Sequence, residues 1–244
     1  MLEYLKARAR SRRWYRALQT IFYGMRGAVE AHIVGTRFQT WLWRRRSGDV
    51  AQQFVDSLDH PHRAMLADRV AAYSPLRQVL EFGCNSGANL HVLARRLPNA
   101  QLVGLDISER AIAAGQREFA ARGFDGVGLR VGTIAHLAEF ATNSVDVAFT
   151  DAVLLYIGPD QVHDLVRELL RVARTAVMFN EWHFDRTAPK AREWRYYYGH
   201  WVYDFRALVA RHSPDARITI TKIPAHVWSG TGWEQFGSII EIVP

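Results

Sequence analysis

The 244-residue chain predicts an α/β fold: a mostly parallel sheet of seven strands with one antiparallel strand, helices on both faces and an N-terminal helical extension. Two observations predict it. From residue 78 onward, short apolar runs alternate with segments of helical apolar spacing, as in right-handed strand–helix–strand units. Near the end, the apolar runs 217–223 and 238–243 follow one another with no helix expected between them. They predict a closing hairpin and hence the antiparallel strand.

The parallel part of the sheet is expected to contain five strands, at residues 79–82, 101–106, 129–131, 145–150 and 176–181. Helices should separate them. Pro98 is expected to end the first, and Ser108 and Gly123 should cap the second at its two ends. A later helix is expected over 160–172. A helical segment over 50–73, interrupted near residues 60 and 61, should precede the first strand.

Residues 1–49 are predicted to form a basic amphipathic helical extension, and residues 50–244 the main domain. Residues 1–46 hold 11 Lys+Arg and 2 Asp+Glu, a net charge of +9, so the other residues carry −2 of the total of +7. Apolar residues recur at helical spacing from Trp14 to Val29 and from Val34 to Leu42. Three interpretations fit: a helical cap over a ligand cleft, peripheral contact of 1–46 with an anionic membrane, or contact with nucleic acid or another partner.

Composition narrows the class of protein. Hydrophobic residues make up 49% and charged residues 23%, which is typical of a globular chain. No apolar run approaches the ~18–20 residues of a membrane-spanning helix, and no secretory signal is expected. The single Cys84 cannot form an internal disulfide, which fits a reducing compartment. We therefore expect a cytoplasmic protein.

A glycine-containing turn, residues 81–87, follows the first strand and opens a helix. Ligands of open α/β sheets bind at the carboxyl ends of the strands, and glycines there let the backbone approach them. A dinucleotide motif would need glycines where Asn85 and Ala88 stand, and no Gly-Lys-Ser/Thr of a P-loop occurs. Asp106 ends the next strand, 25 residues after Glu81. A carboxylate there can accept two hydrogen bonds from a ribose diol, which favours a nucleoside ligand.

Three segments in this order, 79–87, 103–108 and 143–149, resemble the class I S-adenosylmethionine-dependent methyltransferases. The resemblance covers about residues 50–244 and implies a Rossmann-like fold, S-adenosyl-L-methionine as the cofactor, and methyl transfer to a small-molecule or carrier-linked acceptor, with a hydroxyl oxygen expected. A partial resemblance to a branch associated with surface-sugar biosynthesis, in 85–87, 156–160 and the tyrosine-rich segment leading to 204–205, would make the acceptor sugar-related.

The resemblance also implies a set of cofactor-binding residues: Glu81, Gly83, Cys84, Gly87, Asp106, Ile107, Thr133, Ile134 and Asp151. Glu81 would orient the amino group of the methionine moiety, Asp106 would hold the ribose, and Asp151 would lie near the methionine end. Two positions depart from the family pattern: Asn85 replaces a glycine, and Thr133 replaces the aspartate that binds the adenine amino group. The backbone N–H of Ile134 could serve the adenine instead.

Candidate catalytic residues come from the segments after the fifth strand: His183, His200 and Tyr198. The last two belong to an aromatic and basic cluster, 192–201, at a place where this fold commonly builds a substrate lid. Ordinary packing would also explain each of them. His60-Pro61-His62 is interpreted as a surface turn, and no metal site is expected because no carboxylate or cysteine partner lies at a recognised spacing.

Rival functions remain open at this point. A nucleic-acid methyltransferase would use the basic arm, but Thr150-Asp151-Ala152-Val153 stands where the Asn/Asp-Pro-Pro-Tyr/Phe signature of amino-group methylases would follow the fourth strand. Nucleic acid is therefore an unlikely partner. A non-catalytic nucleoside-binding protein would share the same turn. An NAD enzyme is disfavoured by the missing glycines.

Overall fold

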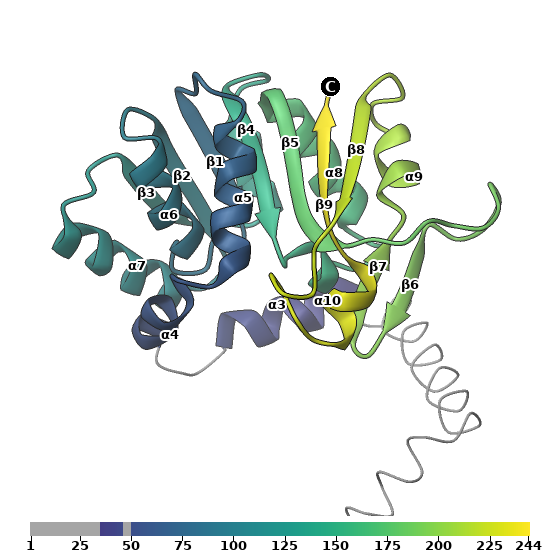
Figure 1. Cartoon of the computed structure of the whole chain (residues 1–244), viewed down its shortest axis with the longest axis horizontal. Helices are drawn as coiled ribbons and strands as arrows, with labels where there is room; N and C mark the ends of the chain where they lie inside the picture. The colour runs from purple at the N-terminus through teal and green to yellow at the C-terminus, as the bar shows by residue number, and fades with distance from the viewer. Residues whose placement is uncertain (1–34, 46–49) are drawn as a thin grey trace, which may run out of the picture.

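The computed structural model describes residues 35–45 and 50–244 (Figure 1). A seven-stranded sheet lies at the centre, with its strands in the order β3-β2-β1-β4-β5-β9-β8. The strands are β1 (Gln78–Phe82), β2 (Gln101–Asp106), β3 (Val127–Val131), β4 (Val145–Asp151), β5 (Ala173–Trp182), β8 (Arg217–Lys222) and β9 (Gly237–Val243).

The sheet has the predicted mixture of strand directions. Strands β1 to β5 pair in parallel, whereas β9 pairs antiparallel with both β5 and β8. The predicted closing hairpin and its one antiparallel strand are confirmed. Strand β1 pairs with both β2 and β4, so the order of the strands reverses at this point. In open α/β sheets such a switch point is where a ligand-binding crevice forms, at the carboxyl ends of the strands.

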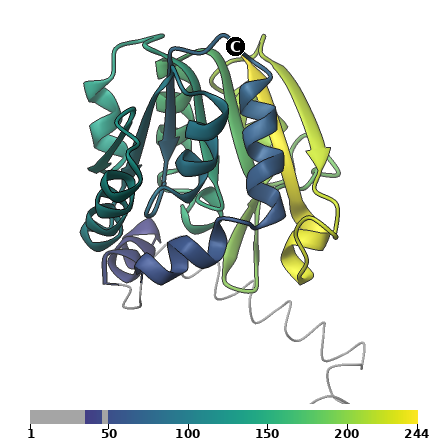
Figure 2. The ribbon, with the colours of Figure 1, turned by 60° about the vertical axis from the view of Figure 1, so that its left-hand side comes forward.

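Helices cover both faces of the sheet (Figures 1 and 2). Alternate residues of one strand point to opposite faces, so Val79 and Leu80 of β1 belong to two different core clusters. The first cluster includes buried residues of α4 (Val50–Ser57), α5 (Pro61–Ala71), α6 (Ala88–Arg96) and α7 (Glu109–Arg122). The second includes buried residues of α8 (Val162–Val172) and α9 (Phe205–Ala210).

The boundaries of α7 follow its capping residues. The Ser108 hydroxyl accepts a hydrogen bond from the Ala111 amide at 3.3 Å, and Gly123 ends the helix with a φ of 70°. An N-terminal serine satisfies an amide that the helix leaves unpaired, and a C-terminal glycine adopts the left-handed conformation without strain. Both predicted caps are confirmed.

Two elements differ from the expectation. A short helix, α10 (Thr231–Phe236), lies between β8 and β9, so the prediction of no helix there is wrong. Trp233 of this helix packs against Trp182 of β5, with ring centroids 6.1 Å apart, and stacks on the neighbouring Trp228 at 3.6 Å. The aromatic segment after β5 forms a separate hairpin, β6 (Trp194–Tyr197) and β7 (His200–Tyr203). Its turn residues, Tyr198 and Gly199, both have positive φ, as tight hairpin turns require.

Helix α3 (Gly35–Arg45) matches the second predicted helical pattern of the extension and lies below the sheet in the view of Figure 1. The remainder of the predicted extension, residues 1–34 and 46–49, lies outside the described residues. Within the part of the chain that the structure describes, no helix has the length and apolar character to span a membrane.

Candidate active site

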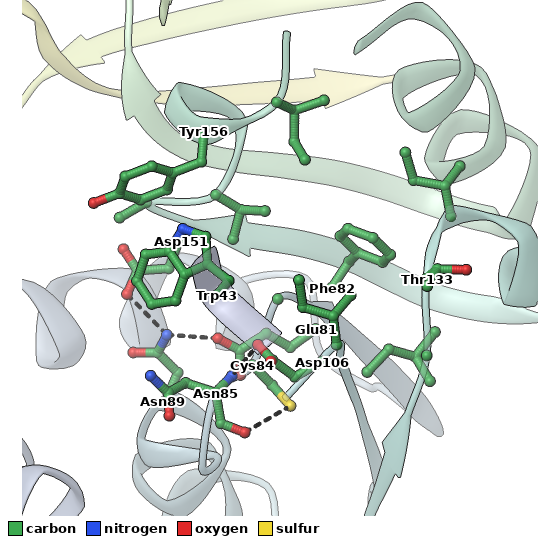
Figure 3. Close-up of a pocket in the computed structure, with 18 of the residues that line it drawn as sticks. Trp43, Glu81, Phe82, Cys84, Asn85, Asn89, Asp106, Thr133, Asp151 and Tyr156 are labelled. Atoms are coloured by element: carbon green, nitrogen blue, oxygen red, sulfur yellow. Dashed lines mark hydrogen bonds between the residues drawn. The ribbon is translucent and has the colours of Figure 1, made fainter. Parts of the chain in front are cut away.

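A cavity of ≈ 1110 Å³ opens at the carboxyl ends of β1, β2 and β4, at the switch point of the sheet (Figure 3). The glycine turn after β1, the ends of β2 and β4, α3 and α5 all contribute to its wall. Ligand pockets in proteins commonly measure about 300–1,000 Å³. The cavity is therefore large enough for a nucleoside and a second small ligand together.

The glycine turn has the backbone conformation that its sequence predicted. Gly83, Asn85 and Gly87 have φ values of 79°, 51° and 87°, so Asn85 adopts the left-handed conformation that asparagine tolerates. A Cβ atom on Gly83 would lie 2.3 Å from Cγ2 of Val153. The amides of Gly83 and Cys84 donate to the Leu105 carbonyl at 2.7 and 3.0 Å, which fixes the turn against β2.

Asp106 presents an oriented carboxylate to the cavity. Its Oδ2 accepts a hydrogen bond from the Asn85 amide, and its Oδ1 accepts one from the Ser108 amide, both at 2.8 Å. Burial raises the pKa of Asp106, although these amides oppose the shift. Each carboxylate oxygen can accept more than one hydrogen bond. Asp106 can thus hold the turn and still receive two hydroxyl groups of a ligand.

Glu81 is a buried carboxyl group, and only one of its two oxygens has a hydrogen-bond partner among the described residues. Its side chain is 1% exposed and lines the cavity. Oε1 accepts a hydrogen bond from Asn89 Nδ2 at 2.7 Å, whereas Oε2 is buried and has no hydrogen-bond partner within residues 35–45 and 50–244. Burial raises the pKa of Glu81 to about 8. Because an unpaired buried polar atom is costly, a cationic donor at this end of the cavity would stabilise the site.

Asn89 connects Glu81 to a second buried acid, Asp151. The same Nδ2 atom donates to Asp151 Oδ2 at 2.9 Å, as the dashed lines of Figure 3 show. Asp151 also accepts from His62 Nε2 at 3.0 Å and from Asn180 Nδ2 at 2.6 Å. Burial alone would raise the pKa of Asp151, but His62, Arg63 and Asn89 lower it to about 2. The pKa of Asp151 thus lies below its usual value, which favours the carboxylate form at neutral pH.

The opposite end of the cavity is less polar. Ile107, Thr133 and Ile134 line it. The Thr133 amide and hydroxyl both contact His136 Nδ1, at 3.0 and 3.1 Å, because Thr133 caps the 3-10 helix η2 (Ile134–Glu139). Thr133 thus stabilises the start of η2. The Ile134 amide lies in the first turn of η2, where helical amides lack an internal partner and can serve a ligand.

Comparison with known proteins agrees with this arrangement. Residues 79–176, which run from β1 into β5, match the family model described as a methyltransferase domain. Residues 79–176 are therefore similar to a methyltransferase domain. The fold and the turn geometry are the ones that the three sequence segments predicted.

Known relatives of the methyltransferase domain are distant. Trans-aconitate 2-methyltransferase from Acidovorax ebreus (strain TPSY) is 30% identical over 108 residues, and the protein of the same name from Acidovorax sp. (strain JS42) gives the same values. The match takes in 44% of this chain and 38% of each relative. The chain thus spans less than half the length of the curated relatives it matches.

Solved structures share the fold at low sequence identity. The plantazolicin methyltransferase BamL, in complex with a triazolic desmethylPZN analog and SAH, superposes with a TM-score of 0.61 at 12% identity, covering 85% of this chain and 95% of that one. Magnesium protoporphyrin IX methyltransferase (ChlM) from Synechocystis PCC 6803 with bound SAM gives a TM-score of 0.52 at 16% identity, covering 91% and 96%.

Of the residues predicted to bind the cofactor, all but Gly87 line the cavity of the methyltransferase domain: Glu81, Gly83, Cys84, Asp106, Ile107, Thr133, Ile134 and Asp151. Gly87 lies at the start of α6, where its Cβ would meet Phe119 at 2.7 Å. Its described role is close packing of the turn. The structure thus brings the predicted cofactor residues together at one cavity; their individual contacts with a ligand stay predictions.

The three predicted catalytic residues lie elsewhere. His183 is 8% exposed, its Nδ1 accepts from the Phe205 amide at 3.3 Å and its Nε2 lies 3.2 Å from Asp185. Tyr198 is 46% exposed at the tip of the β6–β7 hairpin. The ring of His200 lies 5.2 Å from that of Tyr156, which lines the cavity. None of the three lines the cavity itself, so catalysis by them stays a prediction that their positions do not favour.

The interpretation of His60-Pro61-His62 as a surface turn is wrong. His60 is the N-cap of α5, His62 is 3% exposed, and both side chains line the cavity. A signal for this was present in the sequence. His62 precedes Leu66 and Val70 at four-residue steps, which places the three on the buried face of one helix.

Helix α3 closes another side of the cavity. Its residues Gln39, Thr40 and Trp43 line the wall, and the Trp43 ring lies 4.9 Å from that of Tyr156 in a T-shaped contact. This position is the one expected of a helical cap. The prediction for the more N-terminal residues, 1–34, falls outside the described residues.

Proposed function

We propose that the chain transfers a methyl group from S-adenosyl-L-methionine to a small-molecule or carrier-linked acceptor, with a hydroxyl as the accepting group. One observation carries the proposal. Glu81 and Asp106, at the ends of two neighbouring strands, face one cavity, and one buried oxygen of Glu81 has no hydrogen-bond partner in the part of the chain that the structure describes. S-adenosylmethionine, when bound, supplies an amino group, a ribose diol and a methyl group on a positively charged sulfur.

The residues present fit such a molecule. Glu81 would accept a hydrogen bond from the ammonium group, and Asp106 would accept two from the ribose hydroxyls. The glycine turn lies between Glu81 and Asp106, and its glycines, which lack side chains, would let the part of the cofactor that joins the amino group to the ribose approach the backbone closely. Ile107 and the Ile134 amide would receive the adenine. The solved relatives whose names mention SAM or SAH support the same assignment.

The acceptor would occupy the part of the cavity beyond Asp151. Aromatic side chains from three different elements line it: Trp43, Tyr156 and Trp228. Arg63 also lines it, and a guanidinium group there suits a phosphate or carboxylate on the acceptor. The relatives are named for trans-aconitate, plantazolicin and magnesium protoporphyrin IX, so their names do not converge on one acceptor. A sugar-related hydroxyl fits the aromatic lining.

Mass spectrometry of reaction mixtures tests the proposal. The purified chain would be incubated with S-adenosylmethionine and separate pools of nucleotide sugars, phenols, carboxylic acids including trans-aconitate, and oligonucleotides. We expect S-adenosylhomocysteine to form together with a methylated small molecule. Methylation of oligonucleotides alone would favour the nucleic-acid rival, and ligand binding with no turnover in any pool would favour a non-catalytic nucleoside-binding protein.

We also propose peripheral contact of the N-terminal region, residues 1–46, with anionic membrane. The observation that supports it is on α3, where Trp41 and Leu42 are 48% and 39% exposed beside the exposed Arg44 and Arg45. Interfacial helices combine such aromatic and basic residues. Co-sedimentation should show salt-sensitive binding to anionic vesicles and none to neutral ones. Equal sedimentation with and without residues 1–46 would contradict the proposal.

A further inference from the structure

Two histidines and an aspartate form a continuous hydrogen-bonded chain at the wall of the cavity. Asp151 Oδ2 lies 3.0 Å from His62 Nε2, and the Nδ1 atoms of His62 and His60 contact each other directly. His62 and Asp151 have side chains only 4% and 6% exposed, whereas His60 is half-buried. This hydrogen-bonded chain thus runs from the buried carboxylate of Asp151 outward to His60, which lines the cavity.

One arrangement of protons on these contacts leaves His60 Nε2 with a lone pair. A carboxylate only accepts hydrogen bonds, so His62 must carry a proton on Nε2. In this arrangement His62 Nδ1 accepts from His60 Nδ1, and the His62 amide, 3.4 Å from His60 Nδ1, is left without that acceptor. His60 Nε2 is left with a lone pair. This is the arrangement of a base whose ring is oriented by a second group and whose developing charge is stabilised by a third.

His60 also has hydrogen-bond partners after it has taken up a proton. When His60 Nε2 gains a proton, its Nδ1 proton can pass to His62, which then carries the positive charge beside ionised Asp151. His60 Nδ1 becomes an acceptor in that state. The His62 amide, 3.4 Å away, is oriented to donate to it. Both protonation states of His60 therefore have hydrogen-bond partners among the residues of α5 and β4.

The groups around His60 keep it neutral before reaction. Burial, His62 and Arg63 lower the pKa of His60, and Asp151 opposes them. Arg63 is held in place by hydrogen bonds to the Ser57 carbonyl at 2.7 Å and to Asn89 Oδ1 at 2.6 Å. The remaining neighbour is uncharged: the Trp228 ring lies 4.0 Å from that of His62 and 5.3 Å from that of His60.

The histidine chain lies at the end of the cavity where the methyl group would be presented. Asn89 donates both to Asp151 and to Glu81, so the acid that orients His62 and the acid that would bind the cofactor's ammonium share one hydrogen-bond donor. The glycine turn next to Glu81 lines the same cavity as His60. His60 is thus beside the region between the methionine end and the aromatic lining.

We propose that His60 is the catalytic base that deprotonates a hydroxyl acceptor, with His62 and Asp151 as positioning residues. The inference rests on the proposed function. The acceptor's O–H bond breaks and its proton passes to His60 Nε2, while the oxygen's electron pair forms the bond to the methyl carbon. The sulfur–methyl bond breaks at the same time, and its electron pair returns to sulfur, giving S-adenosylhomocysteine.

The proposal narrows the acceptor class. A hydroxyl group needs a base at neutral pH, whereas a carboxylate is already ionised and does not. A built base therefore favours alcohol or phenol acceptors over carboxylic acids such as the one named in the curated relatives. In kinetic terms, loss of the base should slow methylation of a hydroxyl and leave methylation of a carboxylate nearly unchanged.

Long-range proton–nitrogen correlation NMR of the wild-type chain with S-adenosylhomocysteine tests the tautomer without any acceptor. At about pH 7 we expect His60 to carry its proton on Nδ1 and His62 on Nε2. A His60 that is protonated on Nε2, or doubly protonated, would overturn the proposal. Assignment uses His60→Gln and His62→Gln, with His226→Gln as a control at an exposed histidine of the loop before α10.

A second experiment measures how fast wild type and the same variants methylate a phenol and a benzoate of matched size. His60→Gln should lower kcat for the phenol about 100-fold or more, which is the usual size of general-base catalysis, and leave the benzoate rate within a few-fold. The kcat of wild type should rise with pH through the pKa of His60, and that dependence should vanish in His60→Gln. Equal losses for both acceptors would indicate a structural role. Absence of S-adenosylhomocysteine binding to wild type would instead contradict the proposed function.

Discussion

The imidazole Nε2 of His62 lies 3.0 Å from Oδ2 of Asp151, although 89 residues separate the two in the chain. The contact joins α5, which precedes the first strand, to the end of β4. Through this contact, a helix that belongs to neither the glycine turn nor β2 becomes part of the cavity wall. The side of the cavity formed by His62 is therefore built by long-range packing, whereas the side formed by the glycine turn is built by the local strand–turn–helix unit.

Replacement of Gly83 tests the turn. In Gly83→Ala, the new Cβ would lie 2.3 Å from Val153, and the backbone would keep a φ of 79° that alanine disfavours. We expect a loss of stability of about 1–3 kcal/mol and a large loss of S-adenosylhomocysteine affinity. Urea denaturation and calorimetry measure the two effects. Gly128→Ala, in β3, is the matched control because its Cβ would meet nothing within 4 Å; an equal loss there would count against the explanation.

Asn89 is expected to matter for both stability and binding. Asn89→Ala removes the donor shared by Glu81 and Asp151 and leaves Glu81 with no described hydrogen-bond donor. Such unsatisfied buried groups cost about 1–3 kcal/mol each. We expect destabilisation of this size in thermal or chemical unfolding, together with weaker ligand binding. Asn99→Ala, at an exposed position before β2, should have neither effect.

The stability of the ligand-free chain should fall as pH rises. Glu81 has a pKa of about 8 in the folded state against a usual value of 4.5. Below 4.5 it is protonated in both states, and its contribution is complete. As pH rises from there to about 8, the unfolded state loses the proton first, so stability decreases by up to about 1.4 kcal/mol per pH unit. Urea denaturation should show a flatter dependence in Glu81→Gln; an unchanged slope would contradict this origin.

Ligand binding should release a proton at neutral pH. Free Glu81 is protonated at pH 7, and an ammonium group placed beside it favours the carboxylate. The binding enthalpy of S-adenosylhomocysteine should then depend on the ionisation enthalpy of the buffer, by nearly one proton per ligand. Calorimetry in phosphate and in Tris separates the cases. Glu81→Gln should show no such dependence, and a wild-type enthalpy independent of buffer would argue against contact between Glu81 and the amino group.

The sequence predicted the local features of this molecule well, because strand alternation, caps and the glycine turn depend on neighbouring residues. Ser108 caps the N-terminus of α7 with its hydroxyl, and Gly123 ends the helix with its positive φ. The features it missed depend on distant packing. The short helix α10 packs Trp233 against Trp182 of β5, and the buried His62 contacts Asp151 of β4. The sequence did not predict that Tyr198 lies in a hairpin turn, because aromatic and basic residues occur both in substrate lids and in strand pairs.

The central claim is that the cavity at the switch point binds a ribose-bearing sulfonium nucleoside through Asp106 and Glu81. Calorimetry with S-adenosylhomocysteine tests it most directly, on wild type and on Asp106→Ala, with NAD as the competing ligand. The substitution removes two charge-assisted hydrogen bonds, each worth about 1.5–3 kcal/mol and not strictly additive, so we expect wild type to bind and the variant to lose at least about tenfold in affinity. Unchanged affinity in Asp106→Ala, or tighter binding of NAD than of S-adenosylhomocysteine to wild type, would contradict the account.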